Sequence, residues 1–273
     1  MSGRLVVCPT PIGNLEDVTL RVLSALRDAD VVACEDTRRT RVLLDRYGVS
    51  ARLVAYHEHN ESAQAAALVE QMHRGETVAL VSDAGMPLVS DPGFVLVRSC
   101  VAAGVEVEVL PGPSAALAAL VASALPADHW RFEGFLPRKK GELRSLLAEP
   151  GGTLVAFESP RRVAASLEVL ASIDPSRPVA VCRELTKAHE ELVRGEAAEL
   201  ARRYADEDPR GEVVLVIGPA APPPSDPSAP AGLDALRRLV EAGARPRPAA
   251  AVVAELTGGR ANELYRALMR SED

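Results

Sequence analysis

The sequence predicts an α/β protein with two α/β domains and a small helical domain at the end. Three observations support this prediction. Short apolar segments alternate with amphipathic segments through the first half of the chain, such segments recur with shorter connections after residue 130, and a proline-rich segment then precedes a helical stretch. The predicted bounds are 1–125 for the N-terminal α/β domain, 126–218 for the second α/β domain, 219–231 for a linker and 232–273 for the helical domain.

The N-terminal domain is expected to contain a mostly parallel sheet. Its strand candidates are continuous apolar runs, as in strands that helices cover on both faces. The expected strands are 5–8, 31–34, 53–56, 77–81 and 105–110, and the expected helices are 18–27, 38–47, 61–74, 93–103 and 113–124. Because ligands of such sheets bind beyond the carboxyl ends of the strands, the loops after these strands are candidate sites.

The second domain is expected to contain a mixed sheet, since some of its connections are too short for a crossover helix. Gly134–Glu142 combines glycine, proline and three cations and is expected to be a connector. The expected strands are 153–157, 179–183, 190–193 and 213–217, and the expected helices are 160–171 and 196–204.

The end of the chain is expected to be helical. Six prolines between Pro219 and Pro230 predict an extended spacer. The segments 233–242, 248–256 and 261–269 then predict three short helices. Their shared core is marginal at this size, so we expect the bundle to dock on another surface.

Composition places the chain among globular proteins, with 273 residues, 47% hydrophobic and 25% charged. No apolar run approaches the ~20 residues of a membrane span, and the start lacks a signal-peptide pattern, so we expect a cytoplasmic protein without a membrane partner. The four cysteines are scattered and are expected to be buried small side chains, outside any zinc site or disulfide.

The charge pattern restricts how this chain can meet nucleic acid. A net charge of −7 argues against a general nucleic-acid coat protein, which carries a basic footprint. Residues 232–273 hold seven Arg and six acidic residues, net +1, so the remainder carries −8. Arginine makes up 28 of the 31 basic residues, and its planar guanidinium suits phosphate contacts. Any RNA must therefore meet a local concentration of arginine.

Three loops rich in proline and glycine follow predicted strands: Pro9–Asn14 (PTPIGN), Ser82–Gly93 (SDAGMPLVSDPG) and Pro111–Ala115 (PGPSA). The ATPase and dinucleotide glycine motifs are absent. Some residues of these loops have a structural interpretation, because Asn14, Asp17 or Ser114 can cap a helix. For Asp91 with Pro92 we favour such a helix cap. Three rigid loops at one sheet edge predict a ligand site.

These loops belong to a longer series of motifs in a fixed order. The series adds Glu35–Thr40 (EDTRRT), Glu133–Lys139 (EGFLPRK), Phe157–Arg162 (FESPRR) and Arg183–Glu191 (RELTKAHEE). Together they resemble the ribosomal RNA small subunit methyltransferase I family, from the first strand to Ile217, with a weaker similarity in the tail. That family belongs to the tetrapyrrole methylase superfamily and methylates the ribose 2′-oxygen of a decoding-centre cytidine in 16S rRNA.

The resemblance implies a tetrapyrrole-methylase-like fold, a homodimer and S-adenosylmethionine as the cofactor. The implied cofactor-binding residues are Pro11, Asp83, Ala84, Gly85, Pro87, Ser114, Ala115, Phe157, Arg183 and Leu185. This chain departs from the usual residues of the family at two places. Met86 stands where the family usually has threonine, and Pro160-Arg161 stands where it often has Thr-His. Position 86 is therefore given no polar contact.

Methyl transfer to a ribose hydroxyl gains from a base and from stabilisation of the developing alkoxide. The catalytic candidates are Lys187, Glu184 and Glu35, without a choice among them for the base. The RNA-binding candidates are Arg38, Arg39, Arg138, Lys139, Arg161 and Arg162, for which ion pairs with nearby carboxylates are the alternative. No metal is expected, because the histidines near His57 lack a third group of ligands.

Two other functions remain open from the sequence. A methyltransferase of the same fold could act on a tetrapyrrole or another small molecule, although such relatives usually carry a glycine-rich first loop in place of PTPIGN. A non-catalytic ribosome-assembly factor could keep the fold for RNA binding alone. The resemblance implies 16S rRNA in the assembled small ribosomal subunit as the substrate. Only 3% of residues are aromatic, so a stacking platform for single strands is poorly supplied, and this favours a folded target over free single-stranded RNA.

Overall fold

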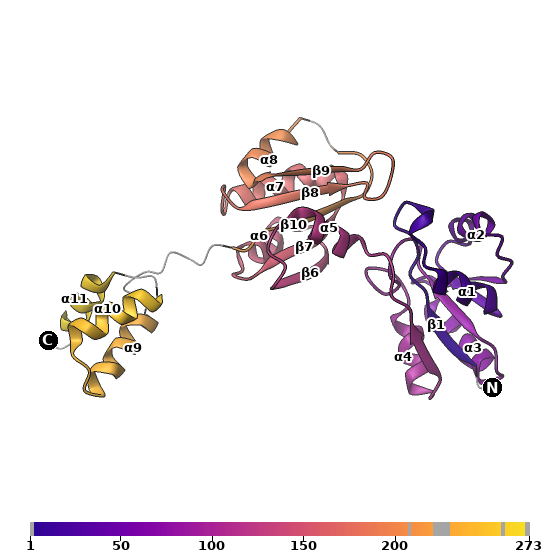
Figure 1. Cartoon of the computed structure of the whole chain (residues 1–273), viewed down its shortest axis with the longest axis horizontal. Helices are drawn as coiled ribbons and strands as arrows, with labels where there is room; N and C mark the ends of the chain where they lie inside the picture. Colours follow the sequence, from indigo (N-terminus) through magenta and orange to yellow (C-terminus); the bar gives the residue numbers. More distant parts are fainter. Residues whose placement is uncertain (1–2, 207–208, 221–229, 258–259, 271–273) are drawn as a thin grey trace. The chain divides into compact units, whose positions relative to one another are not determined.

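The computed structural model describes residues 3–206, 209–220, 230–257 and 260–270. The chain forms two compact units, Met1–Pro219 and Ala220–Asp273 (Figure 1). Most of the expected linker, residues 221–229, lies outside the described residues. The predicted end of this linker at residue 231 is wrong, because a helix already begins at Pro230. Proline is tolerated in the first turn of a helix.

The first sheet is entirely parallel, in the order β3-β2-β4-β1-β5. Its strands are β1 (Arg4–Val7), β2 (Val31–Cys34), β3 (Leu53–Ala55), β4 (Val78–Val81) and β5 (Glu106–Val109). Strands β2 and β4 are buried at every position, which is why they read as continuous apolar runs. All five carboxyl ends therefore lie at one edge of this sheet.

Helices cover both faces of the first sheet. Leu26 and Leu43 belong to the core on one face and Leu68 and Leu96 to the core on the other. The elements are η1 (Leu15–Asp17), α1 (Leu20–Asp28) and α2 (Thr37–Arg46) on the first face, and α3 (Glu61–His73) and α4 (Phe94–Ala102) on the second. The segment after His57 is thus the start of a helix.

The second sheet is mixed, in the order β6-β7-β10-β8-β9. Its strands are β6 (Trp130–Phe135), β7 (Thr153–Glu158), β8 (Pro178–Arg183), β9 (Glu191–Glu196) and β10 (Val213–Ile217). Only β6 and β7 pair in parallel, and the other pairs are antiparallel. This arrangement confirms the predicted mixed sheet.

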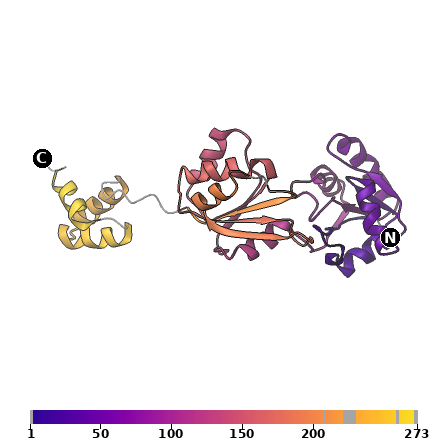
Figure 2. The same cartoon turned by 90° about the horizontal axis from the view of Figure 1, so that it is seen from above.

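Figure 2 shows helices on both faces of this sheet. One face carries α6 (Lys140–Ala148), η2 (Pro160–Arg162), α7 (Val163–Ala171) and α8 (Ala197–Arg203). The other face packs against α5 (Ala115–Ser123), whose Ala119 and Leu120 meet Ala180 and Val214. The predicted boundary between the two α/β domains, at 125/126, assigns α5 to the N-terminal domain. In the structure this helix packs on the second sheet.

The connector expected at Gly134–Glu142 is wrong at both ends, because β6 extends to Phe135 and α6 begins at Lys140. A register shift in β6 between Phe132 and Phe135, with Gly134 at φ +65°, breaks the alternation that marks a strand. Cations at the start of α6 oppose the helix dipole, so the sequence pattern there does not predict a helix.

The second unit consists of α9 (Pro230–Glu241), α10 (Pro246–Thr257) and α11 (Ala261–Arg270). Leu236, Val253, Leu264 and Leu268 form its core. Three helices around one small core match the predicted helical tail. Among the residues that the structure describes, no helix has the length and apolar character to cross a membrane.

The second sheet offers a direct test of core packing. Leu215 in β10 is fully buried between the helix layers, whereas Leu20 at the start of α1 is 82% exposed. We expect Leu215→Ala to lower the free energy of unfolding by about 2–5 kcal/mol through the lost burial and the cavity it leaves. Leu20→Ala is the matched control and should change it by less than about 0.5 kcal/mol. Denaturant unfolding followed by Trp130 fluorescence reports on this sheet, since Trp130 lies in β6 and is the single tryptophan. An equal loss of unfolding free energy in both variants would contradict this packing.

Candidate active site

Two loops at the carboxyl edge of the first sheet are joined by backbone hydrogen bonds. Thr10 follows β1 and Gly85 follows β4, and the N–H of each donates to the carbonyl of the other, at 2.8 and 2.9 Å. The Thr10 hydroxyl also donates to the Ser82 carbonyl at 3.0 Å. Gly85 has φ +80°, a conformation that other residues rarely adopt, so glycine is required at this junction.

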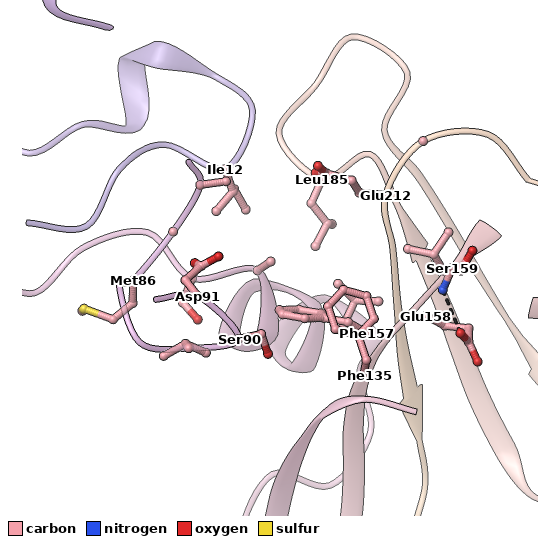
Figure 3. Close-up of a pocket in the computed structure, with 18 of the residues that line it drawn as sticks. Ile12, Met86, Ser90, Asp91, Phe135, Phe157, Glu158, Ser159, Leu185 and Glu212 are labelled. Carbon is pink, nitrogen blue, oxygen red and sulfur yellow. Dashed lines mark hydrogen bonds between the residues drawn. The ribbon is translucent and has the colours of Figure 1, made fainter. Parts of the chain in front are cut away.

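A cavity of about 280 Å³ lies beside this junction, within the first unit (Figure 3). Its wall combines the loops after β1, β4 and β5 with residues of β6, β7 and β10 and of the loop after β8. Its lining includes Ile12, Gly85, Asp91, Ser114, Phe157 and Leu185. Apolar side chains with a few polar groups among them are the usual lining of a small-molecule site.

The segment between β4 and α4 has a strained backbone. Leu88 and Ser90 have φ of +73° and +65°, and Gly93 has φ +139°. At Leu88 and Ser90, which are not glycine, such a conformation costs about 1–3 kcal/mol each, and strain of this kind concentrates at functional sites. Helix α4 begins at Phe94 with Gly93 as its N-cap, so the cap role expected of Asp91 and Pro92 is wrong. The left-handed residues direct the Asp91 side chain to the cavity instead of the first amides of α4.

Asp91 lies in an acidic environment. Burial and the neighbouring Glu35 raise its pKa to about 7, with a smaller contribution from Asp83 and an opposing hydrogen bond from Ser82. Burial, Asp83 and Glu58 likewise raise the pKa of Glu35. A carboxyl with a pKa near neutrality can take up or release a proton under physiological conditions.

A cationic centre lies in the loop after β8. The Lys187 ammonium is 2.8 Å from Glu184 Oε1 and 3.0 Å from Glu212 Oε2. Burial alone would lower the pKa of Lys187, but these two hydrogen bonds outweigh burial and raise it. The hydrogen bond from Lys187 and that from the Glu212 N–H hold the pKa of Glu184 below its usual range. Lys187 is therefore a cation and Glu184 an anion at neutral pH.

The loop after β8 also contacts the first loop of the chain. The Asn14 N–H donates to the Thr186 hydroxyl at 3.0 Å. A Cβ at Gly13 would lie 2.5 Å from Lys187 Cγ and 2.9 Å from Thr186 Oγ1, so only glycine allows this close approach. The PTPIGN loop thus links the first sheet to the segment that carries Lys187.

Sequence relatives agree with this geometry. The model of the tetrapyrrole (corrin/porphyrin) methylases matches residues 4–201. A ribosomal RNA small subunit methyltransferase I from Mesorhizobium japonicum is 48% identical, over 98% of this chain and 92% of its own length. One from Escherichia coli O157:H7 is 44% identical, over 97% and 94%. The chain belongs to the ribosomal RNA small subunit methyltransferase I family. The predicted family is therefore confirmed.

A solved structure shows the same fold. Uroporphyrin-III C-methyltransferase from Thermus thermophilus, complexed with S-adenosyl homocysteine, superposes with a TM-score of 0.57 over 79% of this chain and 97% of its own. Its sequence identity of 22% makes this a likeness of fold alone. The predicted fold class, two α/β domains of tetrapyrrole-methylase type with a helical tail, is confirmed.

Six of the ten residues that the family resemblance implied for the cofactor line the cavity. They are Ala84, Gly85, Ser114, Ala115, Phe157 and Leu185. The other four, Pro11, Asp83, Pro87 and Arg183, lie outside the lining. Asp83 instead accepts a hydrogen bond from the Asp36 N–H at 3.0 Å and lies 3.5 Å from Arg39. Arg183 pairs with Glu191 at 3.0 Å.

The three catalytic candidates have different positions. Lys187 and Glu184 flank the cavity residue Leu185, and Lys187 pairs with the cavity residue Glu212. Glu35 is outside the lining, and its charge raises the pKa of the lining residue Asp91. Among the described residues, no group of three or more His, Cys, Asp or Glu is arranged to hold a metal ion.

The six RNA candidates fall in two regions, α2 and the segments around β7. Arg38 is 89% exposed and pairs with Asp36, the N-cap of α2, at 2.9 Å. Lys139 pairs with Glu142 at 2.8 Å, while Arg138 and Arg161 are exposed without a partner among the described residues. These groups can turn to a phosphate at little cost, since exposed ion pairs are weak.

Arg162 is engaged inside the protein. Its guanidinium donates to the carbonyls of Leu136 and Pro137, at 3.3 and 2.6 Å, and lies 3.2 Å from Glu158 Oε1. The Glu158 side chain is fully buried and also accepts from the Ser166 hydroxyl at 2.6 Å. Arg162 therefore holds the segment after β6 against the end of β7, which leaves Arg161 as the cation directed to solvent.

Sequence reasoning missed several lining residues: Ser90, Asp91, Phe135, Glu158, Ser159 and Glu212. For Ser90 and Asp91 the Ser-Asp-Pro-Gly run was a signal, since it is too rigid for a plain helix entry. Phe135 lines the cavity because the shift at Gly134 places Phe132 and Phe135 on the same ring, Phe157, at 5.0 and 5.5 Å between centroids. Met86 also lines the cavity, and its side chain packs against the apolar core on the α3–α4 face of the first sheet. This apolar contact agrees with the absence of the threonine hydroxyl that the family usually has at this position.

Arg162 and its neighbour Arg161 give a matched pair of variants for measuring how much the ion pair with the buried Glu158 stabilises the fold. Arg162→Met should lower the free energy of unfolding by about 3 kcal/mol, because it leaves the buried Glu158 carboxylate without its cation. Arg161→Met removes an exposed guanidinium and should change stability by less than about 0.5 kcal/mol. Chemical denaturation of both variants measures the difference. A similar small effect in both would show that Arg162 is a surface cation like its neighbour.

Proposed function

We propose that this chain transfers a methyl group from S-adenosylmethionine to the ribose 2′-hydroxyl of a decoding-centre cytidine in 16S rRNA, within the assembled small ribosomal subunit. The observation that carries the proposal is the cavity where three strand-end loops meet the second sheet, in a chain of this family. We further propose that the enzyme works as a homodimer in the cytoplasm.

The cavity suits this cofactor in size and chemistry. Phe157 and Leu185 offer apolar surface for the adenine, and the left-handed Gly85 lets a ligand approach the backbone closely. Ser114 is the N-cap of α5, and its hydroxyl accepts from the Leu117 N–H. The start of a helix favours negatively charged or polar acceptor groups of a ligand. When bound, S-adenosylmethionine supplies an electrophilic methyl group on a sulfonium.

Lys187 supplies the positive charge for the reaction in this proposal. As the hydroxyl loses its proton, negative charge develops on the ribose oxygen, and a preorganised cation stabilises that charge. Glu184 and Glu212 hold the ammonium in place from two sides. Glu184 itself is a poor proton acceptor, because its pKa is lowered and both Lys187 and the Glu212 N–H occupy its Oε1.

The exposed cations would bind the RNA backbone. Phosphate contacts dominate affinity for nucleic acid, so an acidic protein must gather its positive charges locally. Arg38, Arg39, Arg138, Lys139 and Arg161 are the candidates for this contact. A structured target such as an assembled subunit presents phosphates at fixed positions, which local groups of cations such as Arg38 with Arg39 and Arg138 with Lys139 can match.

The decisive experiment is methyl transfer from isotope-labelled S-adenosylmethionine to unmethylated small subunits, naked 16S rRNA and uroporphyrinogen. We expect label as 2′-O-methylcytidine, strongest on assembled subunits, after nuclease digestion. Label on uroporphyrinogen alone would instead assign the chain to small-molecule methylation. Tight binding to subunits without cofactor affinity or transfer would identify a non-catalytic assembly factor.

Two variants should separate the chemical step from RNA binding. Lys187→Ala should lower kcat by about 10²-fold, because the developing charge loses its cation, while Lys187→Arg retains more activity. Arg38→Ala should leave kcat unchanged at saturating subunits and reduce the salt dependence of binding by about one charge. Arg46→Ala, on the same helix, is the control for a generic charge loss. Wild-type kinetics in both Lys187→Ala and Arg38→Ala would overturn these roles.

A further inference from the structure

Three residues with carboxylic side chains belong to the cavity lining, and two of these side chains already have partners. Glu158 is fully buried and held by Arg162, the Ser166 hydroxyl and the Ser159 N–H. Glu212 pairs with Lys187. Asp91 is the third, and within the described part of the chain no lysine or arginine forms an ion pair with it.

The groups that face Asp91 come from the ends of two central strands. Glu35 follows β2, and Ser82 and Asp83 follow β4. Arg39 on α2 pairs with Asp83, and His57 and Glu58 act on Glu35. The Asp91 carboxyl therefore has a hydroxyl and two acidic neighbours but, among the residues that the structure describes, no ion-pair partner.

The position of Asp91 is fixed from both domains. The left-handed Leu88 and Ser90 set its direction, and a Cβ at Gly93 would lie 2.7 Å from Leu88 Cδ1. A Cβ at Gly134 in β6 would lie 3.3 Å from Ser90 Oγ, so the second domain packs closely against this segment. A strained loop held so tightly presents its carboxyl to the cavity with little freedom.

We propose that Asp91 is the proton acceptor for the ribose 2′-hydroxyl. This inference rests on the proposed function and names the base that the sequence left open. In the step, the hydroxyl proton moves to an Asp91 carboxylate oxygen while the ribose oxygen forms its bond to the methyl carbon. The bond between that carbon and sulfur breaks, and its electron pair stays on sulfur.

The electrostatics of the site support this role. A base works best when its pKa is near the operating pH, since it is then both ionised and basic. Burial first and Glu35 second bring the pKa of Asp91 to about 7. Below that pH the carboxyl is protonated and cannot accept a proton; above it the carboxylate is available. The rate should therefore rise with pH through about 7 and level off above it.

Kinetics with matched variants test the assignment. Asp91→Asn keeps the shape but cannot accept the proton, so kcat on small subunits should fall by about 10²-fold or more, with S-adenosyl homocysteine affinity within about threefold by calorimetry. Asp91→Glu should retain partial activity. Asp128→Asn, the same change at an exposed position before β6, should match wild type. Glu35→Gln should move the midpoint of the pH–rate profile to lower pH, because it removes a like charge.

A titration without substrate gives an independent readout. The carbon-13 carboxyl resonance that Asp91→Asn abolishes should titrate near pH 7 in the wild type and at lower pH in Glu35→Gln. Titration near the ordinary aspartate value of about 4 would overturn the inference. Methyl transfer by Asp91→Asn at the full wild-type rate would also overturn the inference. If the wild type itself transfers no methyl group to any RNA, the proposed function fails first, and this inference with it.

Discussion

The reciprocal hydrogen bonds between Thr10 and Gly85 are the contact on which the geometry of the site depends. They join the loops after β1 and β4, two adjacent strands in the middle of the first sheet. Because both strands are parallel, their loops leave the sheet at the same edge and can be bonded side by side. Ile12 and Asp91 then lie on a common wall, and the backbone at Gly85 lines the cavity between them.

Helix α5 extends this arrangement to the second sheet. Its first residues follow β5 at the same edge, yet its body packs on β8 and β10. The chain therefore enters the second domain already fixed to both sheets. The contact of Asn14 with Thr186 adds a second link. A cavity lined by both domains is held open by packing on either side of it, which is the preorganisation that positioning in catalysis requires.

Charge is distributed unevenly across this cavity. Lys187 on the second-domain side is held by two carboxylates, whereas Asp91 on the first-domain side has two acidic neighbours and no ion-pair partner within the described ranges of the chain. Hydrogen bonds and charge pairing with Glu184 and Glu212 keep Lys187 protonated, whereas burial first and the charge of Glu35 second raise the pKa of Asp91 to about 7. In the proposed reaction, an acidic protein thus has a stabilising cation beside the cavity and a proton acceptor in its wall, while the cations proposed for phosphate binding lie on the surface.

Much of this protein follows from local sequence. Strands such as 31–34 and 78–81 are continuous apolar runs because both faces are covered, and the strand-end loops mark the edge where ligands bind. The ordered motifs identified the family. The direction of Asp91, the internal partners of Arg162 and the strand at Trp130–Phe135 were decided only by the tertiary structure. Each depends on contacts between residues far apart in the chain, a left-handed loop packed against Gly134 or a guanidinium facing a buried carboxylate, and local periodicity carries no record of such contacts.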